Sequence, residues 1–523
     1  MRRSTLRERS ILVATGLAVT ALVLAPLAAP GYALSYDMVF VPHQPWRAEL
    51  VAPVDSLPRA VPLDALMSLA SQAVPGWLLQ RVVLAGVLLL AAIGAGRLVP
   101  ARRPVVRVAA AVGYAWTPYL AERLLIGHWG LLLAYGALPW LVDAAIRVHR
   151  PGGLRRLVLV ALPAVVTPTG GLIALVTVAV LVTRRGAART TALAVGALLV
   201  LNLPWLVVAG FSAADARTDP AGVAAFAARA ENWSGVFGAL AGTGGIWNGQ
   251  TTPLSRTSPL TPVATGLLLA LAVYGFRTLR GRWPTGAADR LAGLAAAGFL
   301  TALLGALPGG ATVLGWAVAS VPGAGVLRDG QKFLVPYALL LVVAGALGAE
   351  RLADRVAARG AAGGATALLV AALLLPVVVL PDLAFGAAGR LRPVTYPADW
   401  DTVARRLDGR PGEVLSLPFG AYRAYPWNDG RTVLDPLPRY VDADVLVDDT
   451  LWVGSTGVRG ENPRAAAVGR VLAAGGPVTA TGVRWVVVQR TADGQRVDPA
   501  ALAGLREVYA GVDLTLYENP EGR

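Results

Sequence analysis

One carboxylate stands out because it closely follows the first hydrophobic stretch of the chain. Asp37 comes shortly after the apolar segment 11–30, and Phe40 and Trp46 follow it. Aromatic side chains of this kind settle at a bilayer–water interface. In a dry interfacial cavity, a carboxylate can act as a general base or hold a divalent cation such as Mg²⁺ or Mn²⁺. We therefore predict that Asp37 is the catalytic residue and the candidate metal ligand. The alternative is a solvated acidic residue in a loop.

A second group of polar residues lies in segment 119–129, which reads YLAERLLIGHW. Glu122 and Arg123 are adjacent, and His128 follows about one and a half helical turns later. Arginine offers a planar fork to phosphate oxygens, and histidine can change its charge near neutral pH. These residue types predict a substrate-binding group. The alternative is that Glu122 and Arg123 pair with neighbouring side chains and that His128 packs under Trp129.

A third group is the run Arg-Asp-Gly-Gln-Lys at residues 328–332. Lys332 is the only lysine in a chain that otherwise always uses arginine, and a lysine presents a compact point charge that suits a phosphate. We expect Arg123, Arg328 and Lys332 to surround a cavity for the phosphate or pyrophosphate of a lipid headgroup. The alternative is a polar turn that ends in an interfacial anchor.

Several other chemistries are excluded by what the sequence lacks. The chain has no cysteine, which excludes disulfides, zinc–thiolate sites, iron–sulfur clusters and a cysteine nucleophile. It contains no GxxxxGK[ST] phosphate loop and no GxSxG nucleophile motif. Apart from a divalent cation, we therefore expect no cofactor.

The composition indicates that these groups are positioned by membrane helices. The chain has 523 residues, of which 55% are hydrophobic and 15% are charged, whereas soluble domains carry charges at about a quarter of their positions. The net charge of +15 comes almost entirely from arginines. These arginines cluster between hydrophobic segments, so membrane topology explains the positive charge and no nucleic-acid partner is expected.

The apolar segments predict about 11 transmembrane helices. Every cluster of two or more arginines between them falls on one side, which predicts a cytoplasmic amino terminus and an extracytoplasmic carboxyl terminus. Segment 157–182 lies between two basic clusters, the second of which includes Arg184 and Arg185, and we expect it to form a hairpin of two short helices. Segment 62–76 has the pattern of an interfacial amphipathic helix. The expected spans are 11–30, 78–99, 105–119, 131–148, the two halves of 157–182, 190–210, 261–276, 289–307, 334–350 and 366–383.

The last part of the chain has a different pattern. Strand-length apolar runs at 414–419, 483–488 and 514–517 alternate with helical patterns. We therefore predict a transmembrane domain, 1–389, followed by a small extracytoplasmic soluble α/β domain, 390–523. The expected helices of the second domain are 400–407, 463–474 and 499–505.

This combination resembles the GT-C superfamily of integral-membrane glycosyltransferases, which use polyprenyl-phosphate sugars. An aspartate and an interfacial helix in the first external loop, many spans and an external carboxyl-terminal domain carry the resemblance. Tyr36-Asp37 corresponds in position to the catalytic aspartate of that family. Segment 119–129 is similar to a YxxRLLxGHW-type segment of bacterial members, and the subgroup it most resembles is the actinobacterial-type cell-envelope arabinofuranosyltransferases. Asp37 has no acidic neighbour, which departs from protein-O-mannosyltransferases.

The resemblance implies a hexosyl- or pentosyltransferase of the plasma membrane. Such an enzyme moves a sugar from a polyprenyl-phosphate donor to an envelope glycan, lipid or protein acceptor on the outer face, and contributes to envelope biogenesis. Two alternatives stay open. A transporter or flippase for envelope lipids or polysaccharides would also need a polar cavity and a broken hairpin. A non-catalytic envelope assembly protein would use the external domain for binding.

Overall fold

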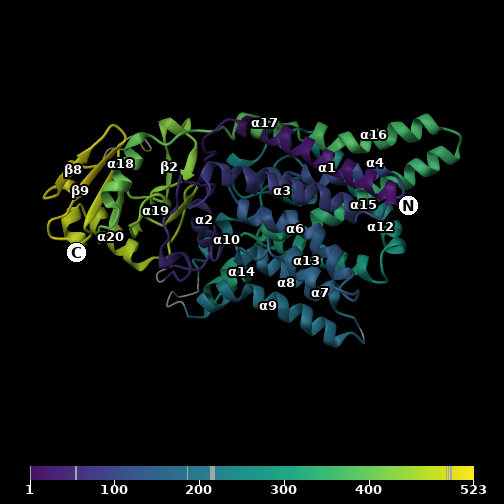
Figure 1. Cartoon of the computed structure of the whole chain (residues 1–523), viewed down its shortest axis with the longest axis horizontal. Coiled ribbons are helices and arrows are strands. Elements are labelled where there is room, and N and C mark those ends of the chain that lie inside the picture. The colour runs from purple at the N-terminus through teal and green to yellow at the C-terminus, as the bar shows by residue number, and fades with distance from the viewer. Residues whose placement is uncertain are drawn as a thin grey trace.

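The structure is a computed structural model that describes residues 2–53, 56–184, 186–211, 218–490, 492, 494 and 497–522, with side chains from residue 7 onward. A long helical bundle carries the amino terminus at one end, and the strands gather at the other end with the carboxyl terminus (Figure 1). Arg185, from one of the predicted basic clusters, lies outside the described residues.

Within the described part of the chain, eight helices are long and apolar enough to cross a membrane. The chain is therefore a polytopic membrane protein, as the sequence predicted. The first span continues past its helix to Ala28, and the seventh begins before its helix at Gly330. The helices of these spans are α1 (Arg2–Leu24), α3 (Gly76–Leu98), α6 (Trp129–Ile146), α9 (Ala188–Phe211), α12 (Thr261–Arg282), α13 (Ala287–Leu304), α15 (Val335–Ala358) and α16 (Ala362–Val379).

The remaining three predicted spans are shorter helices. They are α4 (Pro104–Ala115), α7 (Gly153–Ala161) and α8 (Pro168–Val182). The last two form the expected broken pair, because the chain leaves helical geometry between them and Thr167 then caps α8 by accepting a hydrogen bond from the Gly170 amide at 3.2 Å. Gly171 in α8 approaches α9 so closely that a Cβ there would meet Asn202 Oδ1 at 1.8 Å.

The break after α4 decides where the second polar group lies. The expected span 105–119 ends at Ala115, and a new helix, α5 (Pro118–Leu125), starts after Trp116 and Thr117. The Thr117 hydroxyl caps α5 by accepting from the Leu120 amide at 3.2 Å. Every residue of α5 from Tyr119 to Leu125 is buried, so its polar side chains enter the protein interior.

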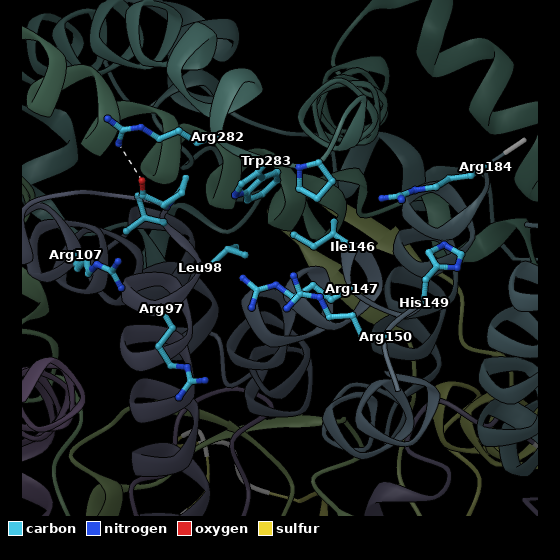
Figure 2. Close-up of a pocket in the computed structure, with 13 residues that line it drawn as sticks. Arg97, Leu98, Arg107, Ile146, Arg147, His149, Arg150, Arg184, Arg282 and Trp283 are labelled. Atoms are coloured by element: carbon cyan, nitrogen blue, oxygen red, sulfur yellow. Dashed lines mark hydrogen bonds between the residues drawn. The ribbon is translucent and has the colours of Figure 1, made fainter. Parts of the chain in front are cut away.

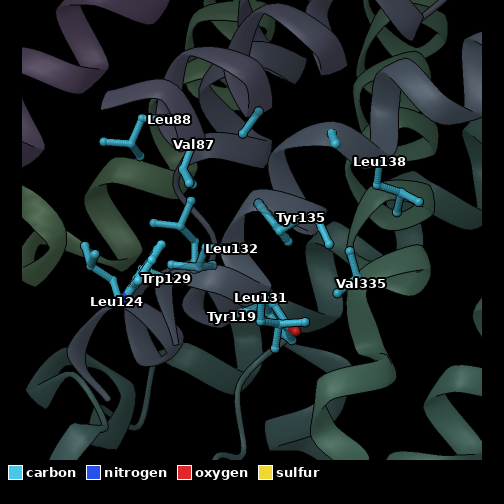
Figure 3. Close-up of a cluster of buried hydrophobic side chains, with 14 of the residues drawn as sticks. Val87, Leu88, Tyr119, Leu124, Trp129, Leu131, Leu132, Tyr135, Leu138 and Val335 are labelled. Carbon is cyan, nitrogen blue, oxygen red and sulfur yellow. The ribbon is translucent and has the colours of Figure 1, made fainter. Parts of the chain in front are cut away.

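The core beneath the site is formed by α3, α5, α6 and α15, which share one buried hydrophobic cluster (Figure 3). Tyr114 and Tyr135 stack with ring centroids 4.2 Å apart and an interplanar angle of 7°. Gly136 lets α6 approach α3, since a Cβ there would meet the Val87 carbonyl at 2.9 Å. This packing gives the site a rigid base.

A five-stranded mixed sheet in the order β4-β1-β7-β9-β8 forms the centre of the carboxyl-terminal part. β1 runs parallel to β4 and β7, and β9 is antiparallel to β7 and β8. The third expected helix, 499–505, is only a short 3₁₀ turn, Pro499–Leu502. The five strands and the two longer helices are β1 (Val414–Leu417), β4 (Val445–Leu446), β7 (Trp485–Gln489), β8 (Arg506–Ala510), β9 (Leu514–Glu518), α18 (Ala398–Leu407) and α20 (Pro463–Ala473).

Two small hairpins, several short helices and a number of 3₁₀ turns make up the rest of the regular structure in the described chain. The hairpin β2–β3 and the hairpin β5–β6 both lie outside the main sheet. The predicted interfacial helix is α2, and it contacts α19 through an ion pair of 3.0 Å between Asp64 and Arg439. The bounds are α2 (Leu63–Ser71), α10 (Ala221–Ala225), α11 (Gly235–Ala241), α14 (Pro308–Ser320), α17 (Ala384–Gly389), α19 (Leu437–Tyr440), β2 (Tyr422–Ala424), β3 (Thr432–Leu434), β5 (Leu451–Val453) and β6 (Thr456–Val458).

Candidate active site

The segment that carries Asp37 is held between the helical bundle and the carboxyl-terminal part. The Gln80 side chain of α3 binds both backbone groups of Ala33, accepting from its amide at 2.9 Å and donating to its carbonyl at 2.8 Å. The Asp37 amide donates to the Ile126 carbonyl at 3.1 Å, just beyond α5. These contacts fix the position of the Asp37 backbone relative to the bundle.

On the other side, the same segment pairs with strand β3. The Tyr36 amide donates to the Thr432 carbonyl at 2.7 Å, and the Leu434 amide donates to the Tyr36 carbonyl at 2.8 Å. Tyr36 has a φ of 45°, a left-handed conformation that non-glycine residues hold only where their surroundings enforce it. Gly127 has a φ of 83°, and a Cβ there would lie 2.1 Å from the Met38 amide nitrogen. This close approach therefore requires glycine at residue 127.

The carboxylate of Asp37 accepts two side-chain hydrogen bonds. Its Oδ1 accepts from the Tyr422 hydroxyl at 2.5 Å, and its Oδ2 lies 3.0 Å from His128 Nε2. Burial alone would raise the pKa of Asp37, but the hydrogen bonds from His128 and Tyr422 and the nearby Lys332 charge outweigh it and lower the pKa. The side chain is still 38% exposed. Asp37 is therefore an ionised, accessible carboxylate in a fixed orientation.

Arg123 determines which nitrogen of His128 carries the proton. His128 Nδ1 lies 2.8 Å from Arg123 Nη1, and because a guanidinium has only donors, Nδ1 must accept. Neutral His128 then carries its proton on Nε2 and donates it to Asp37. Burial lowers the pKa of His128, and the Arg123 charge lowers it further, against the opposing effect of Asp37. The imidazole is therefore neutral at pH 7.

All five N–H groups of Arg123 have partners within the protein. Nη1 and Nη2 donate to the two carboxylate oxygens of Asp329 at 2.7 and 2.8 Å, and Nη1 also donates to His128. Nε donates to Gln331 Oε1 at 2.8 Å, and Nη2 donates to the same oxygen. The side chain is fully buried. Arg123 thus has no free donor for the lipid phosphate that the sequence led us to expect. The alternative expectation, pairing with neighbouring side chains, describes Arg123 correctly, because these neighbours accept from all of its donors.

Glu122 lies behind Arg123 and is fully buried. Its Oε2 accepts from Gln331 Nε2 at 3.0 Å and from the Ile246 amide at 3.2 Å. Burial, together with the nearby Glu231 carboxylate, raises the pKa of Glu122 well above its ordinary value. Glu231 itself pairs with Arg256 at 2.7 Å, and each side chain is 2% exposed. Glu122 therefore supports the arginine from inside and does not reach the cavity beside Asp37.

Arg328 and Lys332 lie near one another in the segment just before the start of α15. Lys332 Nζ is 3.7 Å from Asp329 Oδ2, and the lysine side chain is 28% exposed. The guanidinium of Arg328 lies 4.8 Å from the centre of the Phe226 ring, and burial lowers the pKa of Arg328 to about 10. Neither residue is among the described residues that line the cleft beside Asp37. Arg123 does not line this cleft either, so the phosphate cavity expected between the three cations is not this cleft and stays a prediction.

The cleft beside Asp37 has a volume of about 720 Å³ and lies between the bundle loops and the carboxyl-terminal hairpins. The sequence did not single out Arg229, Trp247, Tyr422 or Trp452 as site residues. Arg229 and Trp247 lie in a polar loop between two spans, a place where a search for polar and aromatic residues could have found them. No local pattern marks Tyr422 or Trp452. The residues that line the cleft include Tyr36, Asp37, Arg229, Trp247, Asn248, Gln250, Phe419, Tyr422, Asp448 and Trp452.

The surroundings of Asp37 do not form a preassembled metal site. Among the residues that the structure describes, no three His, Asp or Glu side chains are grouped to hold an ion. Both oxygens of Asp37 already accept hydrogen bonds. A Mg²⁺ or Mn²⁺ ion would need most of its ligands from substrate phosphate and water, as Mg²⁺ often does. The cation stays a prediction of the sequence.

Comparison with known proteins gives a structural likeness only. No known protein family matches the chain, and no curated protein matches it. The cryo-EM structure of arabinofuranosyltransferase AftD from Mycobacteria superposes with a TM-score of 0.61 and 17% identity over 98% of this chain and 40% of that one. A mutant of AftD gives a TM-score of 0.58 and 18% identity, with 98% and 42% coverage. This likeness concerns the fold alone. The chain spans about 40% of AftD, with which it shares the arrangement of helices and strands.

Proposed function

We propose that the protein is a membrane glycosyltransferase with Asp37 as its catalytic base. The donor is a polyprenyl-phosphate sugar, and the acceptor is a glycan, lipid or protein of the cell envelope, on the outer face of the plasma membrane. The observation that carries this proposal is an ionised carboxylate, oriented by His128 and Tyr422, at the edge of a cleft of about 720 Å³. The AftD-like fold supports it.

In this mechanism, the acceptor hydroxyl enters the cleft and donates its proton to Asp37. The hydroxyl oxygen forms a bond to the anomeric carbon while the bond from that carbon to the lipid phosphate oxygen breaks. The phosphate leaves with the electron pair of that bond. His128 and Tyr422 keep the carboxylate in one orientation, so that the acceptor oxygen meets the anomeric carbon with little loss of orientational freedom.

The charge on the leaving phosphate requires a positive side chain near the cleft. Arg229 lines the cleft beside Asp37 and is exposed. Lys332 is close enough to Asp37 to lower its pKa. We assign the phosphate contact to Arg229, with Lys332 as a positive charge behind the cleft, whereas Arg123, whose donors are all occupied, acts as a positioning residue for His128.

The substitution Asp37→Asn tests the proposal. An amide has nearly the same shape but cannot take a proton, so the transfer rate falls by a factor of about 10² or more, the usual scale for a lost general base. The matched control is Asp442→Asn, because Asp442 is an exposed aspartate of the carboxyl-terminal part, and this variant keeps full activity. The assay measures transfer from a synthetic polyprenyl-phosphate sugar, together with complementation of a deletion strain.

Full transfer activity of a folded Asp37→Asn protein would refute the mechanism. Absence of transfer by the wild-type protein, combined with movement of the lipid-linked sugar across the bilayer of proteoliposomes, would instead identify a transporter. The third outcome is that the wild-type protein shows neither activity, while the Asp37→Asn variant, whose carboxyl-terminal part is unchanged, still complements the deletion strain. In that case the protein is a non-catalytic assembly factor.

A further inference from the structure

A second large cavity lies at the end of the bundle away from Asp37. Helix α6 begins at Trp129, next to His128, and its last residue, Ile146, lines this cavity. Eighteen residues of helix span about 27 Å, so this cavity and the cleft beside Asp37 lie at opposite ends of α6. This second cavity has a volume of about 730 Å³. It opens where α3, α6 and α12 end, and we call it the arginine cavity.

The arginine cavity is strongly basic, and its cationic side chains come from several helix ends and connecting loops (Figure 2). None of the described residues that line it is acidic. The arginine side chains that line it are Arg97, Arg107, Arg147, Arg150, Arg184 and Arg282, and His149 lies among them.

Only part of this charge is neutralised by carboxylates of the protein. Arg282 pairs with the buried Glu350 at 2.5 Å, and Arg147 pairs with Asp143 at 2.9 Å. Among the residues that the structure describes, Arg150 makes no ion pair, and the same holds for Arg97 and Arg184. Like charges collected in one concave surface repel each other, and their field attracts anions. An anion that entered the cavity would therefore stabilise the bundle.

The position of the cavity indicates the source of that anion. Arg97 and Arg282 lie in the last turns of two membrane-crossing helices, and Trp283 lines the cavity beside them. Tryptophan and arginine at helix ends mark the level of the lipid headgroups. The arginine distribution predicts that this end of the bundle is cytoplasmic. Basic pockets between membrane helices on that side bind phosphate headgroups, and the guanidinium fork matches phosphate oxygens.

We propose that the arginine cavity is a binding site for the phosphate headgroup of an anionic lipid from the cytoplasmic leaflet. Its volume leaves room for a headgroup larger than a single phosphate. Arg150 and Arg184 supply free guanidinium groups on two different loops, so the lipid joins the end of α6 to the end of α8. This site is separate from the proposed transferase site and does not depend on Asp37.

The experiment uses the full-length protein in neutral detergent, with cardiolipin as the anionic probe and phosphatidylcholine as the neutral one. Native mass spectrometry gives the affinity, and thermal unfolding gives the stabilisation that binding to the folded state produces. We expect cardiolipin to bind and to raise the unfolding temperature, and phosphatidylcholine to do neither.

The double variant Arg150→Gln/Arg184→Gln removes the two cations on loops that have no ion pair among the described residues, and leaves Arg97 in place. Each basic residue near a lipid surface contributes a factor of about five in affinity, so the loss of two lowers the affinity for cardiolipin by about 25-fold. The control Arg155→Gln/Arg359→Gln removes the same charge from exposed arginines that do not line the cavity, and it changes the affinity much less.

Two results would overturn the proposal. Equal weakening in both double variants would mean that cardiolipin responds to the general surface charge and not to the cavity. Displacement of cardiolipin by inorganic phosphate, or by an acidic soluble protein, would assign the cavity to a soluble anion. Loss of transferase activity in Asp37→Asn leaves these measurements unchanged, so the two proposals can fail independently.

Discussion

The ion pair between Arg123 and Asp329 allows a direct measurement of how strongly the site depends on buried charge. The side chains of Arg123 and Asp329 are 0% and 6% exposed. Removing one partner of a buried pair costs about 3–5 kcal/mol, because it leaves the other charge without compensation. Arg123→Met keeps a similar volume and leaves Lys332, at 3.7 Å, as the remaining ion-pair partner of the Asp329 carboxylate among the described residues. We expect this variant to lose about 3–4 kcal/mol of unfolding free energy.

The chain contains its own control for this measurement. Arg103 and Asp354 form an ion pair of 2.6 Å, but their side chains are 39% and 42% exposed. Exposed pairs contribute about 0–1 kcal/mol, so Arg103→Met has little effect. The double variant Arg123→Met/Asp329→Asn loses less unfolding free energy than the two single variants lose together. The difference is up to about 3 kcal/mol. Unfolding in mild detergent measures all of these variants.

A second measurement separates positioning from general stability. The Arg123 charge lowers the pKa of His128, so its removal lets that imidazole become charged at a higher pH. We therefore expect the pH–rate profile of Arg123→Met to differ from that of the wild type between pH 5 and 8, the range in which histidine titrates. The rates are measured at a temperature where the variant is folded. An Arg123→Met protein as stable as Arg103→Met, with an unchanged pH profile, would refute this reasoning.

Three further predictions concern the loop, the pH response and the topology. Gly127→Ala places a Cβ 2.1 Å from the Met38 amide nitrogen and should reduce transfer at least about tenfold by displacing Asp37, whereas Gly266→Ala, which meets nothing within 4 Å, keeps full activity. Because hydrogen bonds lower the pKa of Asp37, its carboxylate stays ionised, and its stabilising contribution stays intact, down to the unfolded pKa of about 4. That contribution is lost as the pH falls through the lower folded pKa, which an acid titration of unfolding free energy detects, while a loss that begins near pH 6 would contradict it. A reporter fused after Arg185 should be cytoplasmic and one fused after Arg523 extracytoplasmic; an Arg185 fusion that reports outside would mean that the hairpin of α7 and α8 crosses the membrane as one span.

Local patterns identified the membrane architecture because hydrophobic length and arginine position act locally. A bilayer requires about 20 apolar residues per helix, and the eight long helices follow that rule. The basic clusters on both sides of segment 157–182 indicated the hairpin of two short helices, and the structure places the start of α8 at Pro168, after the capping Thr167. The sequence also singled out Asp37 by its distance from the first span.

The tertiary structure alone decided what each polar residue of the site does. Asp37 meets Tyr422, which lies 385 positions away in the chain, and Arg123 meets Asp329 across 206 positions. No local pattern contains such partners, because they result from how the helices and hairpins pack. The sequence assigned Arg123 to a phosphate by its residue type, yet Asp329, Gln331 and His128 together accept from every donor it has. Residue type determined which chemistry was available, and packing determined which donors and acceptors stayed free to perform it.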